Sequence, residues 1–392
     1  MSGKTSKETN VSHSRLLPAA AVLCLFAGTA NAETALFNIS GYTSTDTGIQ
    51  SFEALVFDDD GRIVATGTAD VLGDYPDATR IDGGGRTVLP GLIDAHAHIV
   101  NYGLLQSQLN LVGSPSLDDA VDRIDAFAKD KPHTRWILGR GWNQVLWPVR
   151  EFPRAADIDK VVADRPVWLR RIDGHAGWAN SAAMQLAGIN DGTPDPVGGK
   201  IIRDDNGDAT GVLIDTAMEL VSKHVPQPDK TSTRAAVRAA ANVMLSEGIT
   251  SVHDAGTGVL EAEVFMAMAD DGELDVRIYA MTAGADDVLD AIGEPIVAYG
   301  NDRLDIRSVK LYSDGALGSR GAAMIEPYSD DAETRGLAFW TQDELDAMVA
   351  KANGMGFQVG IHAIGDLGNR MSLNAFEKVQ GGKPSPLRNR IE

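Results

Sequence analysis

The sequence predicts an α/β protein built around a parallel sheet, either doubly wound or closed into a (β/α)8 barrel. Residues 88–95 are almost continuously apolar, as expected for a strand that is buried on both faces. Four more strand-like segments follow, and helix-like segments with capping patterns or a terminal glycine lie between several of them. These four segments are residues 248–252, 276–281, 304–311 and 357–361. The chain of 392 residues is 43% hydrophobic and 23% charged, which is ordinary for a packed globular protein.

The first 32 residues have the pattern of an export signal. Three basic residues precede an apolar core at residues 16–30, and residues 30–32 (ANA) form a small-x-small cleavage pattern. A membrane anchor is the alternative, but it needs about 20 apolar residues. We therefore expect a periplasmic or secreted protein that keeps no stable membrane anchor after cleavage. Cys24 is the single cysteine and falls inside this signal, so the mature chain would have no disulfide.

Residues 33–88 are expected to form a small β-domain. Apolar runs at 54–57 and 62–65 flank an Asp/Gly turn, a pattern that predicts a hairpin. The barrel domain would then extend over residues 89–392. Within it, residues 101–247 are too many for one loop between a strand and its helix, so we expect an insertion with its own helices and strands.

The charge argues against some classes of partner. With 35 Lys+Arg against 55 Asp+Glu, the net charge is −20. Binding of DNA or RNA needs a basic surface, and so does adhesion to anionic lipid. We expect a small-molecule substrate and no nucleic acid, while a homodimer stays open.

Residues 90–98 (PGLIDAHAH) are the strongest chemical signal in the chain. His96 and His98 are two positions apart after an apolar strand, so both side chains point to one face. In a barrel that face is the interior, and active sites form at the carboxyl ends of the strands. Two imidazoles at that place can bind one cation, although ordinary hydrogen-bonded histidines are the alternative.

Together with this motif, five more segments make the sequence resemble the amidohydrolase superfamily, and within it the branch of N-substituted formamide deformylase-like metal-dependent hydrolases. They are residues 139–143 (GRGWN), 171–176 (RIDGHA), 248–256 (GITSVHDAG), 309–321 (VKLYSDGALGSRG) and 361–366 (IHAIGD). The resemblance spans nearly all of the mature chain. It implies a (β/α)8 TIM-type barrel with a small N-terminal β-sandwich.

The resemblance also implies a centre for divalent metal. It assigns His96, His98 and His362 as ligands, and it implies that Lys310 reacts with CO2 to form a carbamate that bridges two ions. A lysine near cations and away from water is pushed toward its neutral amine, the form that reacts with CO2. Imidazole and carbamate suit Zn²⁺, although Fe²⁺, Mn²⁺ and Ni²⁺ also fit. We expect one or two Zn²⁺ ions. Taken alone, Lys310 would be interpreted as a solvated lysine at the barrel rim.

Four residues are candidates for substrate contacts, and each has a structural alternative. His175 could donate a hydrogen bond to a substrate carbonyl or could be a loop histidine packed by Trp178. Asp314 and Arg320 could face the substrate or could hold their glycine-rich loop together. Trp142 could line the mouth, which would favour a substrate with an apolar or aromatic part, or could pack inside the insertion.

The family reaction is hydrolysis of an amide or related C–N bond by metal-activated hydroxide. We therefore expect a hydrolase of non-peptide C–N bonds with an amide, N-acyl or N-formyl substrate. In the family an Asp at the end of strand eight moves the proton, and that Asp would lie beyond residue 392. No catalytic residue is therefore assigned, and we expect a barrel truncated near strand six that binds metal weakly and turns over slowly or not at all.

Two other functions stay open on the sequence. The same ligands serve hydrolases of esters, lactones and cyclic ureides, so the motifs do not choose the bond. An inactive fragment or binding protein that keeps the pocket is the other alternative, and a metal assay would separate it from an enzyme.

Overall fold

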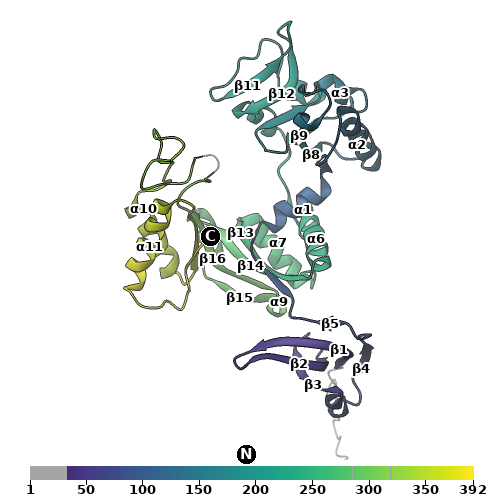
Figure 1. Ribbon diagram of the computed structural model, residues 1–392, viewed down its shortest axis with the longest axis vertical. Coiled ribbons are helices and arrows are strands. Elements are labelled where there is room, and N and C mark those ends of the chain that lie inside the picture. The colour runs from purple at the N-terminus through teal and green to yellow at the C-terminus, as the bar shows by residue number, and fades with distance from the viewer. Residues whose placement is uncertain (1–32, 285, 318–319) are drawn as a thin grey trace, which may run out of the picture. The chain divides into compact units, whose positions relative to one another are not determined.

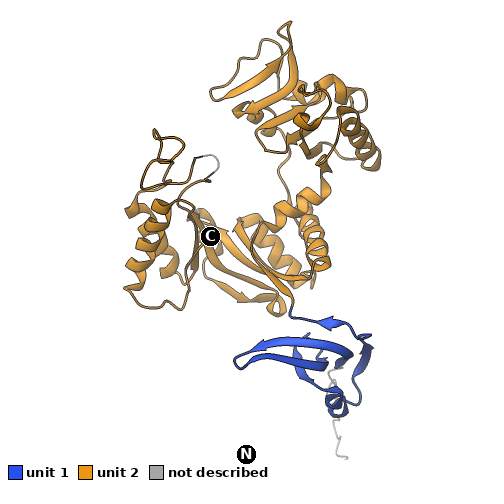
Figure 2. Cartoon of the chain, in the orientation of Figure 1, with its two compact units in different colours: residues 1–90 blue, residues 91–392 orange. Residues whose placement is uncertain are grey.

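The computed structural model describes residues 33–284, 286–317 and 320–392, so the predicted export signal lies outside the described residues. The chain divides into two compact units, residues 1–90 and 91–392 (Figure 2). Within the described ranges no helix is both long and apolar enough to cross a membrane.

The smaller unit contains one five-stranded sheet in the order β3-β2-β1-β4, with β5 also paired to β1. Its elements are β1 (Thr34–Thr45), β2 (Gly48–Phe57), β3 (Ile63–Gly67), the 3-10 helix η1 (Ala69–Asp74), β4 (Thr79–Asp82) and β5 (Thr87–Val88). The predicted hairpin is confirmed, because β2 and β3 pair antiparallel around a turn in which Gly61 has a φ of +76°. The described residues of this unit form a single sheet, so the predicted β-sandwich stays a prediction.

The larger unit is organised around a sheet in which six parallel strands follow one another in the order β6-β13-β14-β16-β17-β18. The strands are β6 (Leu92–Ala97), β13 (Ile249–Thr257), β14 (Arg277–Ala283), β16 (Leu304–Tyr312), β17 (Gln358–His362) and β18 (Arg390–Ile391), with the short β15 (Ile296–Ala298) antiparallel to β16. Such an order of consecutive parallel strands is that of a (β/α)8 barrel. The sheet forms about half of such a barrel (Figure 1).

Helices connect these strands, as the spacing of the strand-like segments predicts. They are α1 (Ile99–Ser107), α6 (Lys230–Ser246), α7 (Val259–Asp270), α8 (Asp286–Ile292), the short α9 (Tyr299–Asp302), α10 (Gln342–Gly354) and α11 (Asp366–Gln380). Local signals set their ends. The Thr341 hydroxyl accepts from the backbone N–H of Glu344 in a capping box at the start of α10. Gly248, with a φ of +80°, follows α6 and allows the chain to turn into β13.

The first strand of the parallel sheet differs from the expectation in its bounds and its burial. The sequence predicts a strand at 88–95 that is buried on both faces, but the strand spans Leu92–Ala97, and Leu92 and Ile93 are 60% and 63% exposed. The reason is position: β6 is an edge strand, paired only with β13 among the described residues. Apolar composition cannot distinguish an edge strand from a central one, because the difference depends on a neighbour far away in the sequence.

The segment between α1 and α6 is a separate layer with a six-stranded mixed sheet in the order β11-β12-β10-β9-β8-β7. Its strands are β7 (Leu109–Asn110), β8 (Ile137–Trp142), β9 (Val167–Arg171), β10 (Ala176–Ala179), β11 (Gly199–Arg203) and β12 (Ala209–Asp215). Its helices are α2 (Leu117–Asp130), η2 (Gln144–Leu146), α3 (Ala155–Asp159), α4 (Ser181–Leu186), η3 (Thr216–Met218) and α5 (Glu219–Ser222). Ser116 caps α2 by accepting from the backbone N–H of Asp119.

The apolar core lies between the parallel sheet and its helices. Side chains of β13, β14 and β16 pack against α1, α6 and α7 in one cluster, and β16 and β17 pack against α10 and α11 in another (Figure 1). Alternate residues of the same strands point to the opposite face. The face opposite the helices is the inner face of the half-barrel. Polar side chains near the carboxyl ends of the parallel strands lie together at one edge of this face.

Candidate metal centre

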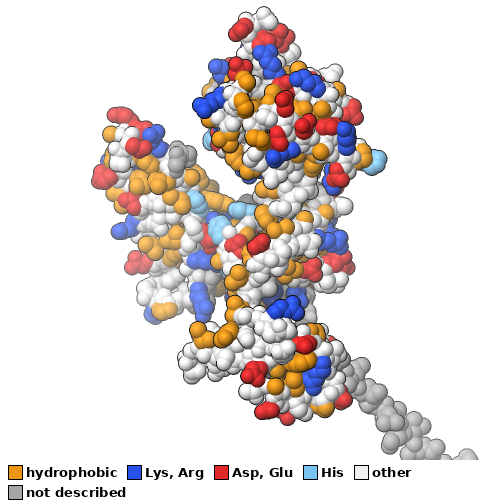
Figure 3. All heavy atoms as spheres, turned by 45° about the vertical axis from the view of Figure 1, so that its right-hand side comes forward, with side chains coloured by type: hydrophobic (Ala, Val, Ile, Leu, Met, Phe, Trp, Pro, Cys, Tyr) orange, Lys and Arg blue, Asp and Glu red, His pale blue; other side chains and the backbone are white. Residues whose placement is uncertain are grey.

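The four predicted metal ligands lie at the carboxyl edge of the parallel sheet. His96 lies near the end of β6, and His98 follows that strand as the N-cap residue of α1. Lys310 lies near the end of β16, which ends at Tyr312, and His362 ends β17. Histidine side chains gather on the surface of the larger unit (Figure 3).

His96 connects the two edges of the sheet. Its ring centroid is 5.7 Å from that of His98 in an edge-to-face arrangement, and its Nδ1 contacts the carboxylate of Glu392. β6 and β18 are the first and last strands of the sheet, so this contact brings together residues that are 296 positions apart. The sheet is therefore curved far enough for side chains from its opposite edges to meet on the inner face.

Lys310 is a buried lysine without an acidic partner. Its side chain is 2% exposed, and its Nζ lies 4.3 Å from the centroid of the Tyr312 ring. In the part of the chain that the structure describes, no ion pair involves this ammonium group. Burial lowers the pKa of Lys310, Arg390 lowers it further, and the Glu392 carboxylate acts in the opposite direction. The surroundings therefore favour the neutral amine.

His362 is placed one strand away from Lys310, with the ring of Tyr312 beside both residues. The Tyr312 and His362 ring centroids are 5.6 Å apart, and His362 Nε2 lies 3.4 Å from the Gly315 carbonyl oxygen. Among the described residues, no group of three His, Cys, Asp or Glu side chains is close enough to hold a metal ion. The structure therefore places His96, His98, Lys310 and His362 at the same edge of the sheet without showing a formed ligand cluster, and their role as ligands stays a prediction.

Asp254 positions the segment that carries His98, a role that the sequence analysis missed. Its side chain is 5% exposed and accepts from the backbone N–H of Ile99 at 2.8 Å and from the Thr257 hydroxyl at 2.6 Å. Burial raises the pKa of Asp254, while the two hydrogen bonds and the neighbouring His98 oppose that rise. Because Ile99 begins α1, the carboxylate of β13 fixes the start of the helix directly after His98.

A second group of polar residues lies next to Glu392 on the inner face. Arg390 lies 2.9 Å from His253 Nδ1 through its Nη1, and its Nε forms an ion pair of 2.6 Å with Glu392. The His253 ring packs on Tyr279 at 4.6 Å between centroids. Burial lowers the pKa of His253, and Arg390 lowers it further. The alternation of Arg390 and Glu392 along a strand is the sequence signal that could have placed both side chains on the inner face.

The four candidates for substrate contacts are dispersed. Trp142 is fully buried in the insertion, where its indole N–H donates to the Leu169 carbonyl oxygen at 2.8 Å. Asp314 is 1% exposed and accepts from three backbone N–H groups. Arg320 forms ion pairs with two carboxylates of its own loop. His175 is exposed, and its Nδ1 lies 2.9 Å from Asp215 Oδ1. Substrate contact stays a prediction for all four.

Comparison with known proteins identifies the class of fold and the family. The chain superposes with a TM-score of 0.74 on the crystal structure of an uncharacterized metal-dependent hydrolase from Pyrococcus horikoshii OT3, at 26% identity, over 92% of this chain and 70% of that one. The fold is therefore a TIM-barrel-like α/β fold. Residues 79–392 match the model of the amidohydrolase family, and the chain belongs to this family, as its motifs predict.

Two curated relatives have similar sequences. YtcJ of Bacillus subtilis (strain 168) is 34% identical over 335 residues, which cover 82% of this chain and 62% of the relative. The N-substituted formamide deformylase of Arthrobacter pascens is 28% identical over 339 residues, which cover 82% of this chain and 61% of the relative. The predicted branch of the superfamily is thus supported. The chain spans about three fifths of the length of these two relatives.

Proposed function

We propose that this chain carries the metal centre of a hydrolase that cleaves C–N bonds other than peptide bonds, in an amide, N-acyl or N-formyl substrate. The proposal depends on one observation, the burial of Lys310 at the carboxyl edge of the parallel sheet that also carries His96 and His98. In the described structure this lysine has no acidic partner. Family membership and the relative named as a formamide deformylase support the bond type. The activity of the whole protein is part of the proposal.

The donor set fits a divalent ion by its chemistry. His96, His98 and His362 offer imidazole nitrogens, and a carbamate on Lys310 would add an anionic oxygen, a combination that suits Zn²⁺. One or two ions would be held by these four residues. Bound there, the metal would supply Lewis acidity, which lowers the pKa of water and polarises a carbonyl group.

The chain's own residues prepare this site in three ways. Burial lowers the pKa of Lys310 and so favours the neutral amine, whose nitrogen can form a bond to the carbon of CO2 and release one proton to give the carbamate. Glu392 contacts His96 Nδ1 and so holds the ring orientation. Asp254 holds the first residue of α1 and thereby the backbone next to His98.

The finer features belong to the same proposal. We expect a closed (β/α)8 barrel and a small N-terminal β-sandwich in the whole protein, and substrate contacts from His175, Asp314, Arg320 and Trp142. Export to the periplasm or outside the cell is proposed from residues 1–32. Mass spectrometry of the exported protein tests this point, because a mature chain should begin at Glu33.

The test of the metal centre is a direct measurement of bound metal. The protein is dialysed against Zn²⁺ and then against metal-free buffer, and its zinc content is measured by inductively coupled plasma mass spectrometry. H96A, H98A and Lys310→Met should each retain much less zinc than the wild type. His133→Ala is the matched control, because His133 is an exposed histidine of the insertion. Equal zinc in the wild type and the H98A variant would contradict the proposal.

The carbamate and the bond type need separate experiments. Incubation with ¹³C-labelled bicarbonate should give a carbamate carbon signal in the NMR spectrum of the wild type that is missing in Lys310→Met. A panel of N-formyl amines, N-acyl amines and lactones then tests the substrate class. Hydrolysis of lactones alone would overturn the assignment to C–N bonds while leaving the metal centre intact.

A further inference from the structure

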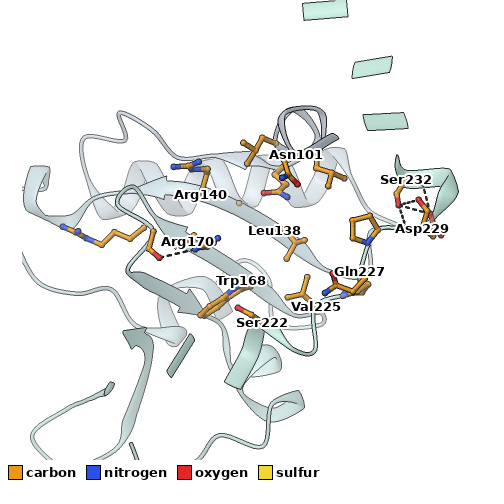
Figure 4. Close-up of a pocket in the computed structure, with 18 residues that line it drawn as sticks. Asn101, Leu138, Arg140, Trp168, Arg170, Ser222, Val225, Gln227, Asp229 and Ser232 are labelled. Carbon is orange, nitrogen blue, oxygen red and sulfur yellow. Dashed lines mark hydrogen bonds between the residues drawn. The ribbon is translucent and has the colours of Figure 1, made fainter. Parts of the chain in front are cut away.

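The larger unit contains a cavity to which none of the proposed metal ligands contributes. Its volume is about 840 Å³, within the range of small-molecule sites. Helix α1 forms one wall, strands β8 and β9 of the insertion form another, and the segment 222–232 closes a third side (Figure 4). Part of the lining comes from residues 139–143 and 171–176, but the two candidate substrate contacts in these motifs, Trp142 and His175, are not among the lining residues.

Two arginines lie side by side in the wall of this cavity. Arg140 of β8 and Arg170 of β9 are register partners on adjacent parallel strands, so their side chains leave the same face of the sheet next to each other. Like charges at neighbouring positions of a sheet destabilise it. An anion bound against the pair would relieve this repulsion.

Neither arginine is neutralised within the described structure. Arg140 donates one hydrogen bond of 3.3 Å to the Ile172 carbonyl oxygen, and Arg170 donates one of 3.3 Å to the Gly174 carbonyl oxygen. No ion pair is formed by either side chain in the described ranges. Arg171, which also borders the cavity, is paired with Asp173 and donates to Gln144. In a chain of net charge −20, two neighbouring arginines without acidic partners are left available to a ligand.

The same face continues as an apolar surface. Leu138 and Trp168 are again register partners, two positions before the arginines, and they too line the cavity. Val225 lies near them (Figure 4). At the far end, the Asp229 carboxylate accepts hydrogen bonds from Ser232 and caps α6. The cavity is thus cationic at one end, apolar along its wall, and acidic at the other end.

We infer that this cavity binds a small amphipathic carboxylate. The carboxylate group lies against Arg140 and Arg170, where guanidinium groups offer strong charge-assisted hydrogen bonds. The apolar body lies along Leu138 and Trp168. Asp229 repels an anion at the opposite end, so the ligand has one preferred direction. The inference goes beyond the proposed hydrolysis and does not depend on bound metal.

The test is isothermal titration calorimetry of the full chain with 4-phenylbutyrate, 4-phenylbutyramide and acetate. The carboxylate should bind saturably, and the neutral amide should bind about tenfold or more weakly because it loses the charge-assisted bonds. Acetate should also bind more weakly, since it lacks the apolar body. Equal affinity for the amide and the carboxylate, or no saturable binding of 4-phenylbutyrate, would overturn the inference without any variant.

Variants locate the site. Arg140→Gln and Arg170→Gln should each weaken 4-phenylbutyrate binding about tenfold. Arg135→Gln, which removes an exposed arginine at the other end of the same strand region, should bind like the wild type. Without ligand, the two cavity variants should unfold at the same or a higher urea concentration than the wild type, because a like-charge contact is removed. Lower stability of both variants, or binding equal to that of Arg135→Gln, would refute the assignment.

Discussion

Replacing Asp314 by alanine should disconnect the loops that follow β16 and β17. The Asp314 carboxylate accepts from the backbone N–H of Ala323 at 2.9 Å and of Gly365 at 2.7 Å through Oδ2, and from Ile364 at 3.0 Å through Oδ1. Ala323 and Gly365 are buried, so their N–H groups would lose their partner without gaining water.

The magnitude follows from these two donors. A buried donor left without a partner costs about 1–3 kcal/mol, so two of them predict a loss of about 2–6 kcal/mol in the free energy of unfolding. The exposed Ile364 donor can bond to water and adds little. Asp314→Asn should fall between alanine and the wild type, because one oxygen is kept while the amide NH2 faces backbone donors.

The assay combines urea unfolding with hydrogen exchange. Unfolding gives the loss of stability, and faster exchange at Ala323, Ile364 and Gly365 shows that the loss arises at this contact. The matched control is Asp366→Ala. Asp366 is exposed and accepts from the Ile325 backbone N–H at 2.8 Å, so its removal should cost less than about 1 kcal/mol. Similar losses in the two alanine variants, with unchanged exchange at Gly365, would refute the reasoning.

Two further predictions concern packing and pH. A Cβ at Gly103 of α1 would lie 1.8 Å from the Ala236 carbonyl oxygen of α6, so Gly103→Ala should destabilise the protein by about 1–3 kcal/mol in thermal or urea unfolding. The control is Gly354→Ala, whose added Cβ meets nothing within 4 Å, and this variant should be neutral or stabilising. Equal stability of the two variants would contradict the tight packing of α1 on α6. Burial acts to raise the pKa of Asp346, but hydrogen bonds from Lys378 and Gln342 outweigh it, and the pKa lies below the usual 3.8. A carboxylate with a lowered pKa stabilises the fold above its unfolded value and loses that contribution as the pH falls through its folded value. Asp346→Asn should therefore cost about 1 kcal/mol at neutral pH, and its unfolding midpoint should approach that of the wild type as the pH falls below 3.8; a difference that persists unchanged in acid would exclude this origin.

The local elements could be predicted because their signals lie within a few residues. The Thr341 capping box, the Ser116 cap and the glycine after α6 each act on neighbouring backbone groups, and all three are found where the sequence places them. The family was also predictable, because six short motifs in order specify it without any coordinates.

Much of the site was not predictable, because it depends on contacts between distant strands. The sequence indicated His96 and Lys310 as ligands, but it did not specify that Glu392 would contact His96 and influence the pKa of Lys310, because the three residues come from remote segments. Asp254 was likewise missed, because its partner Ile99 is 155 positions away.

The amino acids themselves determined the alternation of strands and helices, the pair of histidines at the end of the first barrel strand, and the acidic net charge. Tertiary structure decided that β6 pairs with the remote strand β13 and that Arg140 stands beside Arg170. The physical reason is that periodicity and capping are properties of consecutive residues, whereas strand register, curvature and burial are set by which remote segments pair. Side-chain identity therefore specifies the available chemistry, and pairing across the sheets decides which groups can act together.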